Sequence, residues 1–144
     1  MPEPRSSHRA DYRHFVTIPT RWHDNDVYGH VNNVVYYAFF DTAVNEHLIR
    51  HGGLDVVNDP VVGYVVETSC RFERPFTFPE VVHAGLRVAK LGNASVVYEV
   101  GLFTGDEDTA VATGRFVHVW VERHGGRPAR VPDKIRAALA ALIA

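Results

Sequence analysis

The polar segment from Asp24 to Asn33 contains the residues of this chain best suited to chemistry, and an apolar run from Val34 to Phe40 follows it directly. That run predicts a buried helix, whose first backbone N–H groups have no partner within the helix. A carboxylate loop leading into such a helix brings together an ionised oxygen and N–H groups that can polarise a carbonyl. On residue types alone, however, Asp and Asn before a helix are more often turn formers or caps than catalysts.

Each polar residue of this segment has a structural and a functional interpretation. Asp24 is expected to shape the loop through hydrogen bonds to backbone groups. Asn32 and Asn33 are good helix caps, so any functional part of Asn33 is its backbone N–H. His30 could orient Asp26 or touch a bound ligand, or it could simply make a local hydrogen bond. Tyr28 either lines a pocket beside the loop or covers the end of the helix.

Other chemistries find weaker support in the sequence. His47 and His51 are four residues apart but lack the Glu of a His-Glu-x-x-His element, so we expect no metal site. Cys70 alternates with apolar residues and is expected to be an inert core thiol. Ser95 has no base beside it in the sequence, and no glycine-rich phosphate loop is present.

The hydrophobic pattern predicts one long helix and several strands. We expect a strand from Phe15 to Trp22 and a helix from about Asn33 to about His51, its first half surrounded by protein and its second half reaching solvent. Alternation with period two then predicts four strands between residues 62 and 123, with bulges or bends at Gly101 and Gly114. Pro132-Asp133 could open a short C-terminal helix. The fold class is therefore α+β, with a curved antiparallel sheet of about five strands wrapped around one long central helix.

Length and composition indicate an ordinary globular domain. Its 144 residues, 46% hydrophobic and 22% charged, fit one domain over 1–144, in which 1–12 reads as a flexible lead-in. The formal charge of -2 and the lack of a basic stretch argue against a nucleic-acid partner. No apolar run has the length of a membrane span, and no targeting segment is evident, so we expect a cytoplasmic protein with no membrane partner.

Several segments resemble the 4-hydroxybenzoyl-CoA thioesterase-like family of hotdog-fold acyl-CoA thioesterases. The resemblance rests on Arg21-Trp22-His23-Asp24-Asn25-Asp26, Gly29-His30-Val31-Asn32-Asn33, Tyr36-Tyr37, Phe40-Asp41, Arg71-Phe72-Glu73-Arg74-Pro75 and Leu91-Gly92-Asn93-Ala94-Ser95. It implies the hotdog fold, with Asp26 as the catalytic carboxylate and N–H groups around Asn33 as the receptor of the thioester carbonyl. It also implies a homodimer or homotetramer with the active site at the dimer interface.

The substrate implied by the resemblance is an acyl thioester of coenzyme A or of an acyl carrier protein, with no cofactor apart from the coenzyme A of the substrate. Candidate substrate contacts within the matching helix-start segment are Tyr28, His30, Val31, Asn32 and Tyr36. Ser95 could hydrogen-bond near the thioester or the pantetheine arm.

The phosphates of coenzyme A call for basic residues, and Arg71, Arg74 and Lys90 are the candidates, with Arg115 beside them. Relatives often have basic residues in the turn where this chain has Gly92-Asn93-Ala94. That difference leaves room for a carrier-protein donor or for a nucleotide that stays largely in solvent.

Two alternatives to an acyl-CoA thioesterase share the fold. One is a hotdog enoyl-CoA hydratase or dehydratase, which pairs a His with a carboxylate in different segments, whereas the Asp-x-Asp-x-x-Gly-His element of this chain fits the thioesterase pattern better. The other is a non-catalytic acyl-CoA-binding domain. Fold alone does not separate these functions, because activity resides in the site.

Overall fold

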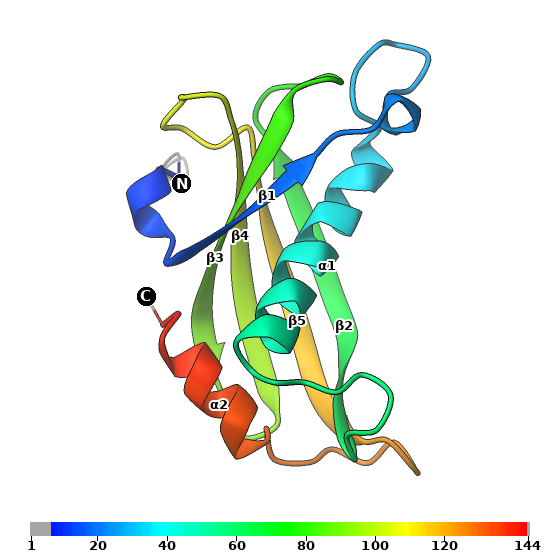
Figure 1. The fold of residues 1–144 in the computed structure, drawn as a ribbon, viewed down its shortest axis with the longest axis vertical. Helices are drawn as coiled ribbons and strands as arrows, with labels where there is room; N and C mark the ends of the chain where they lie inside the picture. The colour runs from blue at the N-terminus through cyan, green and yellow to red at the C-terminus, as the bar shows by residue number, and fades with distance from the viewer. Residues whose placement is uncertain (1–6, 144) are drawn as a thin grey trace, which may run out of the picture.

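A five-stranded antiparallel sheet curves around the long helix α1 (Figure 1). The computed structural model describes residues 7–143. The strands lie in the order β1-β3-β4-β5-β2, so β1 and β2 form the two edges. The elements are β1 (His14–Pro19), α1 (Asn33–Arg50), β2 (Val61–Phe72), β3 (Val81–Leu91), β4 (Ser95–Thr104), β5 (Ala112–Glu122) and α2 (Asp133–Ala140), with 3-10 turns at Arg9–Asp11 and Trp22–Asp24. This is the hotdog arrangement that the sequence predicts.

The core lies between α1 and the concave face of the sheet. Phe40 of α1 is fully buried, as are Tyr98 on β4 and Trp120 on β5. Burying a large apolar side chain in this way stabilises the fold by roughly 1.5–3 kcal/mol. Gly114 lies directly under the Phe40 ring, where a Cβ would clash with it. The missing side chain therefore lets the helix pack close to β5.

The two strand glycines, for which we expected bulges or bends, allow close contacts, and neither marks a bulge. The register shifts fall between Val65 and Glu67 on β2 and between Val88 and Lys90 on β3. On the outer face of the sheet, a Cβ at Gly101 would meet the ring of Tyr12. Gly101 and Gly114 thus accept an aromatic ring on opposite faces of the sheet.

Helix α1 begins and ends close to the predicted positions, but its surroundings differ from our expectation at both ends. At the N-terminal end Val34 is 68% exposed, so the chain itself does not surround the whole first half of the helix. At the C-terminal end, Arg50 and His51 are exposed as expected, but His47 is only 5% exposed. The cause is α2, which lies beside this end of α1 (Figure 1) and whose Ala138 carbonyl is 3.2 Å from His47 Nε2.

The segment before β1 also packs against the domain. We expected a flexible lead-in over residues 1–12, of which 1–6 lie outside the described residues. From Ser7 on, the chain is ordered: Arg9–Asp11 form a 3-10 turn, and Tyr12 is buried against Phe103. Among the described residues, no helix is long and apolar enough to cross a membrane.

Candidate active site

Asp24 fixes the start of the loop between β1 and α1. Its buried carboxylate accepts hydrogen bonds from the Arg21 backbone N–H at 2.7 Å and from the Arg21 guanidinium at 2.9 Å. Its backbone carbonyl accepts from the Asn32 N–H at 2.8 Å. Asp24 therefore joins both ends of the loop, and this confirms the structural role that the sequence predicts for it.

A second segment, residues 76–78 between β2 and β3, holds the middle of the loop. The Asn25 side chain donates to Thr77 Oγ1 at 3.1 Å and accepts from the Phe78 N–H at 3.0 Å. The Val31 N–H donates to the Phe76 carbonyl at 2.8 Å. Nothing in the residue types of this segment points to a partner 52 residues away in the sequence, as Thr77 is from Asn25.

Asp26 is half-buried at the tip of this fixed loop. Its Oδ1 accepts a hydrogen bond from the Tyr28 N–H at 2.8 Å, which closes a local turn. Its Oδ2 has no hydrogen-bond partner among residues 7–143. Asp26 lines a hollow of about 490 Å³ together with Trp22, Val27 and Gly29. One carboxylate oxygen is thus held in place and the other is available to a substrate or a water molecule.

The N-terminus of α1 presents one free backbone donor. The Val34 N–H is capped by Asn32 Oδ1 at 3.0 Å, and the Val35 N–H donates to the Asn32 carbonyl at 2.9 Å. The Asn33 N–H has no partner within the part of the chain that the structure describes. Because α1 has 18 residues, this amide lies at the positive end of a long helix dipole.

Asn33 lines a second hollow, of about 300 Å³, with Val31, Tyr36, Phe72 and Arg74. Tyr36 is 3% exposed, and its ring packs against those of Phe72 and Phe76 at centroid distances of 4.8 and 5.0 Å. Burial raises the pKa of the Tyr36 phenol to about 12, so it stays protonated at neutral pH. This hollow therefore has an apolar aromatic wall next to the free amide.

The remaining loop candidates are exposed. The His30 side chain makes no hydrogen bond among residues 7–143, while the His30 carbonyl accepts from the Asp26 N–H at 2.9 Å. Tyr28 and Val27 project into solvent, and Val27 is 96% exposed. The apolar side chains around Asp26 are thus left exposed by the rest of residues 7–143.

The basic and hydroxyl candidates are dispersed. Arg74 lies near Asn33, but its guanidinium is held by Glu107 and by the Thr109 carbonyl at 2.7 Å. Lys90 and Ser95 flank the β3–β4 turn, at the end of the sheet opposite the α1 N-terminus (Figure 1). Within one chain, the fold therefore groups Val31, Asn33, Tyr36 and Arg74, and it separates Lys90 and Ser95 from them.

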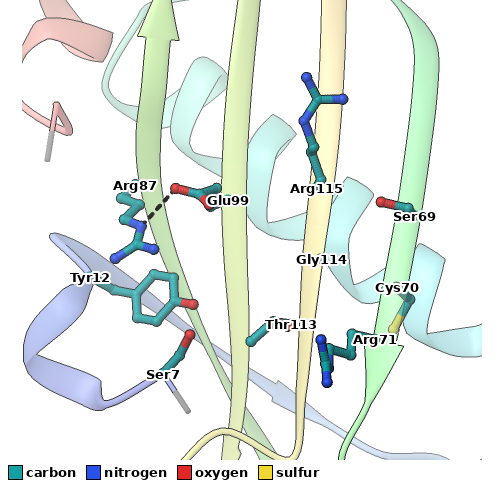
Figure 2. Close-up of a pocket in the computed structure, with 10 residues that line it drawn as sticks. All are labelled: Ser7, Tyr12, Ser69, Cys70, Arg71, Arg87, Glu99, Thr113, Gly114 and Arg115. Atoms are coloured by element: carbon teal, nitrogen blue, oxygen red, sulfur yellow. Dashed lines mark hydrogen bonds and ion pairs between the residues drawn. The ribbon is translucent and has the colours of Figure 1, made fainter. Parts of the chain in front are cut away.

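Arg71 belongs to another hollow, on the face of the sheet that points away from α1 (Figure 2). This space of about 360 Å³ lies beside Tyr12 and contains three arginines. Each is ion-paired: Arg71 with Glu73 at 2.9 Å, Arg87 with Glu99 at 3.0 Å, and Arg115 with Glu67. These pairs leave little free positive charge on this face for the phosphates of a nucleotide.

Cys70 is half-buried at the edge of the core. Its side chain packs against the edge of the core, and burial raises the pKa of the thiol to about 12. The protonated thiol is a poor nucleophile.

Comparison with known proteins places this site in a family context. The model of the thioesterase-like superfamily matches residues 20–139, which include the whole loop and both hollows near α1. A search of curated proteins finds no match.

Among solved structures, the PA5185 protein of Pseudomonas aeruginosa PAO1 is 56% identical with a TM-score of 0.95, over 97% of this chain and 98% of that chain. The PA2801 protein of Pseudomonas aeruginosa, inferred to be a thioesterase, is 33% identical with a TM-score of 0.77, over 88% and 98%. The gentisyl-coenzyme A thioesterase BH1999 has a TM-score of 0.77 at 21% identity, over 88% and 99%, which shows a common fold.

Proposed function

Because this chain belongs to the thioesterase-like superfamily and is a thioester hydrolase, we propose that it hydrolyses acyl-CoA or acyl-carrier-protein thioesters with Asp26 and the Asn33 N–H. The observation that carries the proposal is the free Asn33 amide at the start of α1, one short loop away from a carboxylate with an unpartnered oxygen. The reaction converts the thioester and water to a carboxylic acid and a thiol.

Asp26 is proposed to activate the attack on the carbonyl carbon. The hydrogen bond from the Tyr28 N–H fixes Oδ1 and thereby limits the rotation of the carboxylate. Oδ2 can then take a proton from the attacking water, or attack the carbonyl itself so that the C–S bond breaks and the thiolate leaves. The mixed anhydride formed in the second route is hydrolysed by water, whose proton is passed to the thiolate, and this restores the Asp26 carboxylate. Both routes use the same oxygen and the same loop geometry.

The Asn33 N–H is proposed to stabilise the oxyanion that develops on the thioester oxygen. A preorganised backbone donor of this kind is typically worth on the order of 10²–10³ in rate. The hydrogen bonds that Asn32 accepts from the Val34 and Val35 N–H groups hold the first turn of α1 in place, so the free donor needs little reorganisation. The aromatic wall formed by Tyr36 and Phe72 would exclude water on one side of the thioester.

A second copy of the chain is proposed to complete the site. Among residues 7–143, strand β2 is paired only with β5, and on it Tyr64, Val65 and Val66 are exposed apolar residues. An apolar strand with an unpaired edge favours pairing with another strand. A homodimer formed along β2, or a homotetramer built from such dimers, would extend the sheet and bring a partner surface towards the uncovered Asp26 loop.

This assembly can be tested with one charged substitution. Val66→Lys places a charge on the exposed edge of β2, whereas Val57→Lys, in the loop before β2, is a control of similar exposure. Light scattering after gel filtration should show a dimer or tetramer for the wild type and for Val57→Lys, and smaller species for Val66→Lys. A wild-type protein that is monomeric at micromolar concentration would contradict the proposed assembly.

Activity is tested by thiol release from a panel of acyl-CoA and acyl-carrier-protein thioesters. Asp26→Asn should lower kcat by on the order of 10² or more, the size expected for loss of a general base or nucleophile. Asp106→Asn, in the β4–β5 turn, is the matched control and should retain activity. Binding of acyl-CoA without turnover would contradict the proposal, as would hydration of an enoyl-CoA without thiol release.

A further inference from the structure

Three histidines meet at the C-terminal end of α1, at the other end of the helix from Asp26. His47 and His51 are one turn apart on α1, and His14 comes from the edge strand β1. Their ring centroids are 5.0 Å apart for His14 and His47, 5.1 Å for His14 and His51, and 4.9 Å for His47 and His51. One ring nitrogen from each lies within 4.8 Å of the other two. The sequence pairs only His47 with His51, and the fold brings His14 to them.

The most buried of the three, His47, is arranged like a metal ligand. Its Nε2 lies 3.2 Å from the Ala138 carbonyl of α2, and because a carbonyl only accepts, Nε2 must carry the proton. The lone pair is therefore on Nδ1, which is buried and has no hydrogen-bond partner among residues 7–143. Metal-bound histidines usually donate their second N–H to a carbonyl or carboxylate in this manner. An unpaired buried nitrogen is otherwise costly to the fold.

His14 has a comparable supporting contact. Its Nε2 lies 3.3 Å from Glu46 Oε2, and the other carboxylate oxygen of Glu46 pairs with Arg50 at 3.0 Å. A neutral His14 that donates to Glu46 keeps its lone pair on Nδ1. His51 is exposed, so its ring can turn towards the other two and leave one side open to solvent.

We propose that His14, His47 and His51 bind one divalent transition-metal ion, of which Zn²⁺ is the best match. Three imidazoles with an open fourth position for water are a common zinc ligand set. Tetrahedral Zn–N bonds of about 2.0–2.1 Å place the nitrogens about 3.3 Å apart, so nitrogens that now lie within 4.8 Å of one another need to approach by up to about 1.5 Å. The bound ion would tie β1 to the ends of α1 and α2, far from the thioester site. The inference does not depend on the proposed function.

Metal binding to the untagged, chelator-treated protein tests the proposal. Competition with a chromophoric chelator should give one Zn²⁺ per chain, and Co²⁺ should give the intense visible absorption of a four-coordinate site. His51→Gln should weaken Zn²⁺ binding by about 100-fold or more, because even loss of a supporting residue typically costs 10–100-fold. His14→Gln should do the same from a different element.

Two controls make the result specific. His124→Gln removes an exposed histidine elsewhere and should leave Zn²⁺ affinity unchanged, as should Asp26→Asn. His51→Gln should keep wild-type thiol release, which shows that the chain is folded. At 100 times the dissociation constant, Zn²⁺ should raise the Tm of the wild type by roughly 5–10 °C and have much less effect on His51→Gln. Substoichiometric binding, or binding that survives both His14→Gln and His51→Gln, would overturn the proposal.

Discussion

The cap residue Asn32 connects the stability of the fold to the geometry of the proposed oxyanion donor. Its Oδ1 accepts a hydrogen bond from the Val34 N–H at 3.0 Å, directly after the free Asn33 N–H. Asn32→Ala removes this cap and should lower the free energy of unfolding by about 1 kcal/mol. For a chain of this length, the loss corresponds to a decrease in Tm of roughly 2–4 °C.

The same substitution should affect catalysis moderately. Asn32→Ala leaves the Asn33 N–H in the chain but loosens the turn that aims it. We therefore expect kcat to decrease by less than the 10²–10³ that loss of an entire oxyanion donor typically costs. Thermal unfolding and steady-state thiol release on the same preparations measure both effects.

Asn32→Ser separates a capping role from a substrate-binding role. Serine is also a good N-cap, so this variant should recover most of the lost stability and most of the lost kcat. If the Asn32 amide contacts substrate instead, Asn32→Ser would be stable but would show a raised KM. If Asn32→Ser lowered the free energy of unfolding as much as Asn32→Ala does, the capping argument would be refuted.

Two further predictions follow from buried titratable groups. Burial lowers the pKa of His118 to about 4, so the folded state favours the neutral imidazole. The contribution of neutral His118 to the free energy of unfolding is therefore complete above about pH 6.5 and is lost as the pH falls towards 4. Urea denaturation between pH 4 and 8 should show a loss on the order of 3 kcal/mol from this group, and His118→Leu should flatten that part of the curve. Because burial raises the pKa of Cys70 to about 12, a disulfide reagent at pH 8 should label it slowly in the native protein and rapidly in guanidinium. Rapid native labelling would contradict this.

The sequence predicted those features that depend on local pattern. The helix from Asn33 and the cap at Asn32 follow from an apolar run placed after turn-forming residues, and the structure confirms both. The alternation in residues 62 to 123 likewise predicted β2 to β5. Such features are visible because hydrophobic period and cap chemistry operate over a few neighbouring residues.

Features that depend on contacts distant in the sequence could not be predicted in this way. The burial of His47 depends on α2, whose Ala138 is 91 residues away in the sequence. The histidine cluster likewise needs His14, which comes from β1. Lys90 and Ser95 were candidates for the site, yet strand register places them at the opposite end of the sheet. The positions of Gly101 and Gly114 make sense only once Tyr12 and Phe40 are seen to pack on them.

The central claim is that Asp26 and the Asn33 N–H act on one thioester. The most direct measurement is a crystal structure of the protein with a non-hydrolysable acyl-CoA analogue bound. We predict that the oxygen replacing the thioester carbonyl lies 2.7–3.1 Å from the Asn33 nitrogen, and that a carboxylate oxygen of Asp26 lies within about 3.5 Å of the adjacent carbon or of a water bridging to it. An analogue whose carbonyl is bound away from the α1 N-terminus, with Asp26 turned to solvent, would contradict the account.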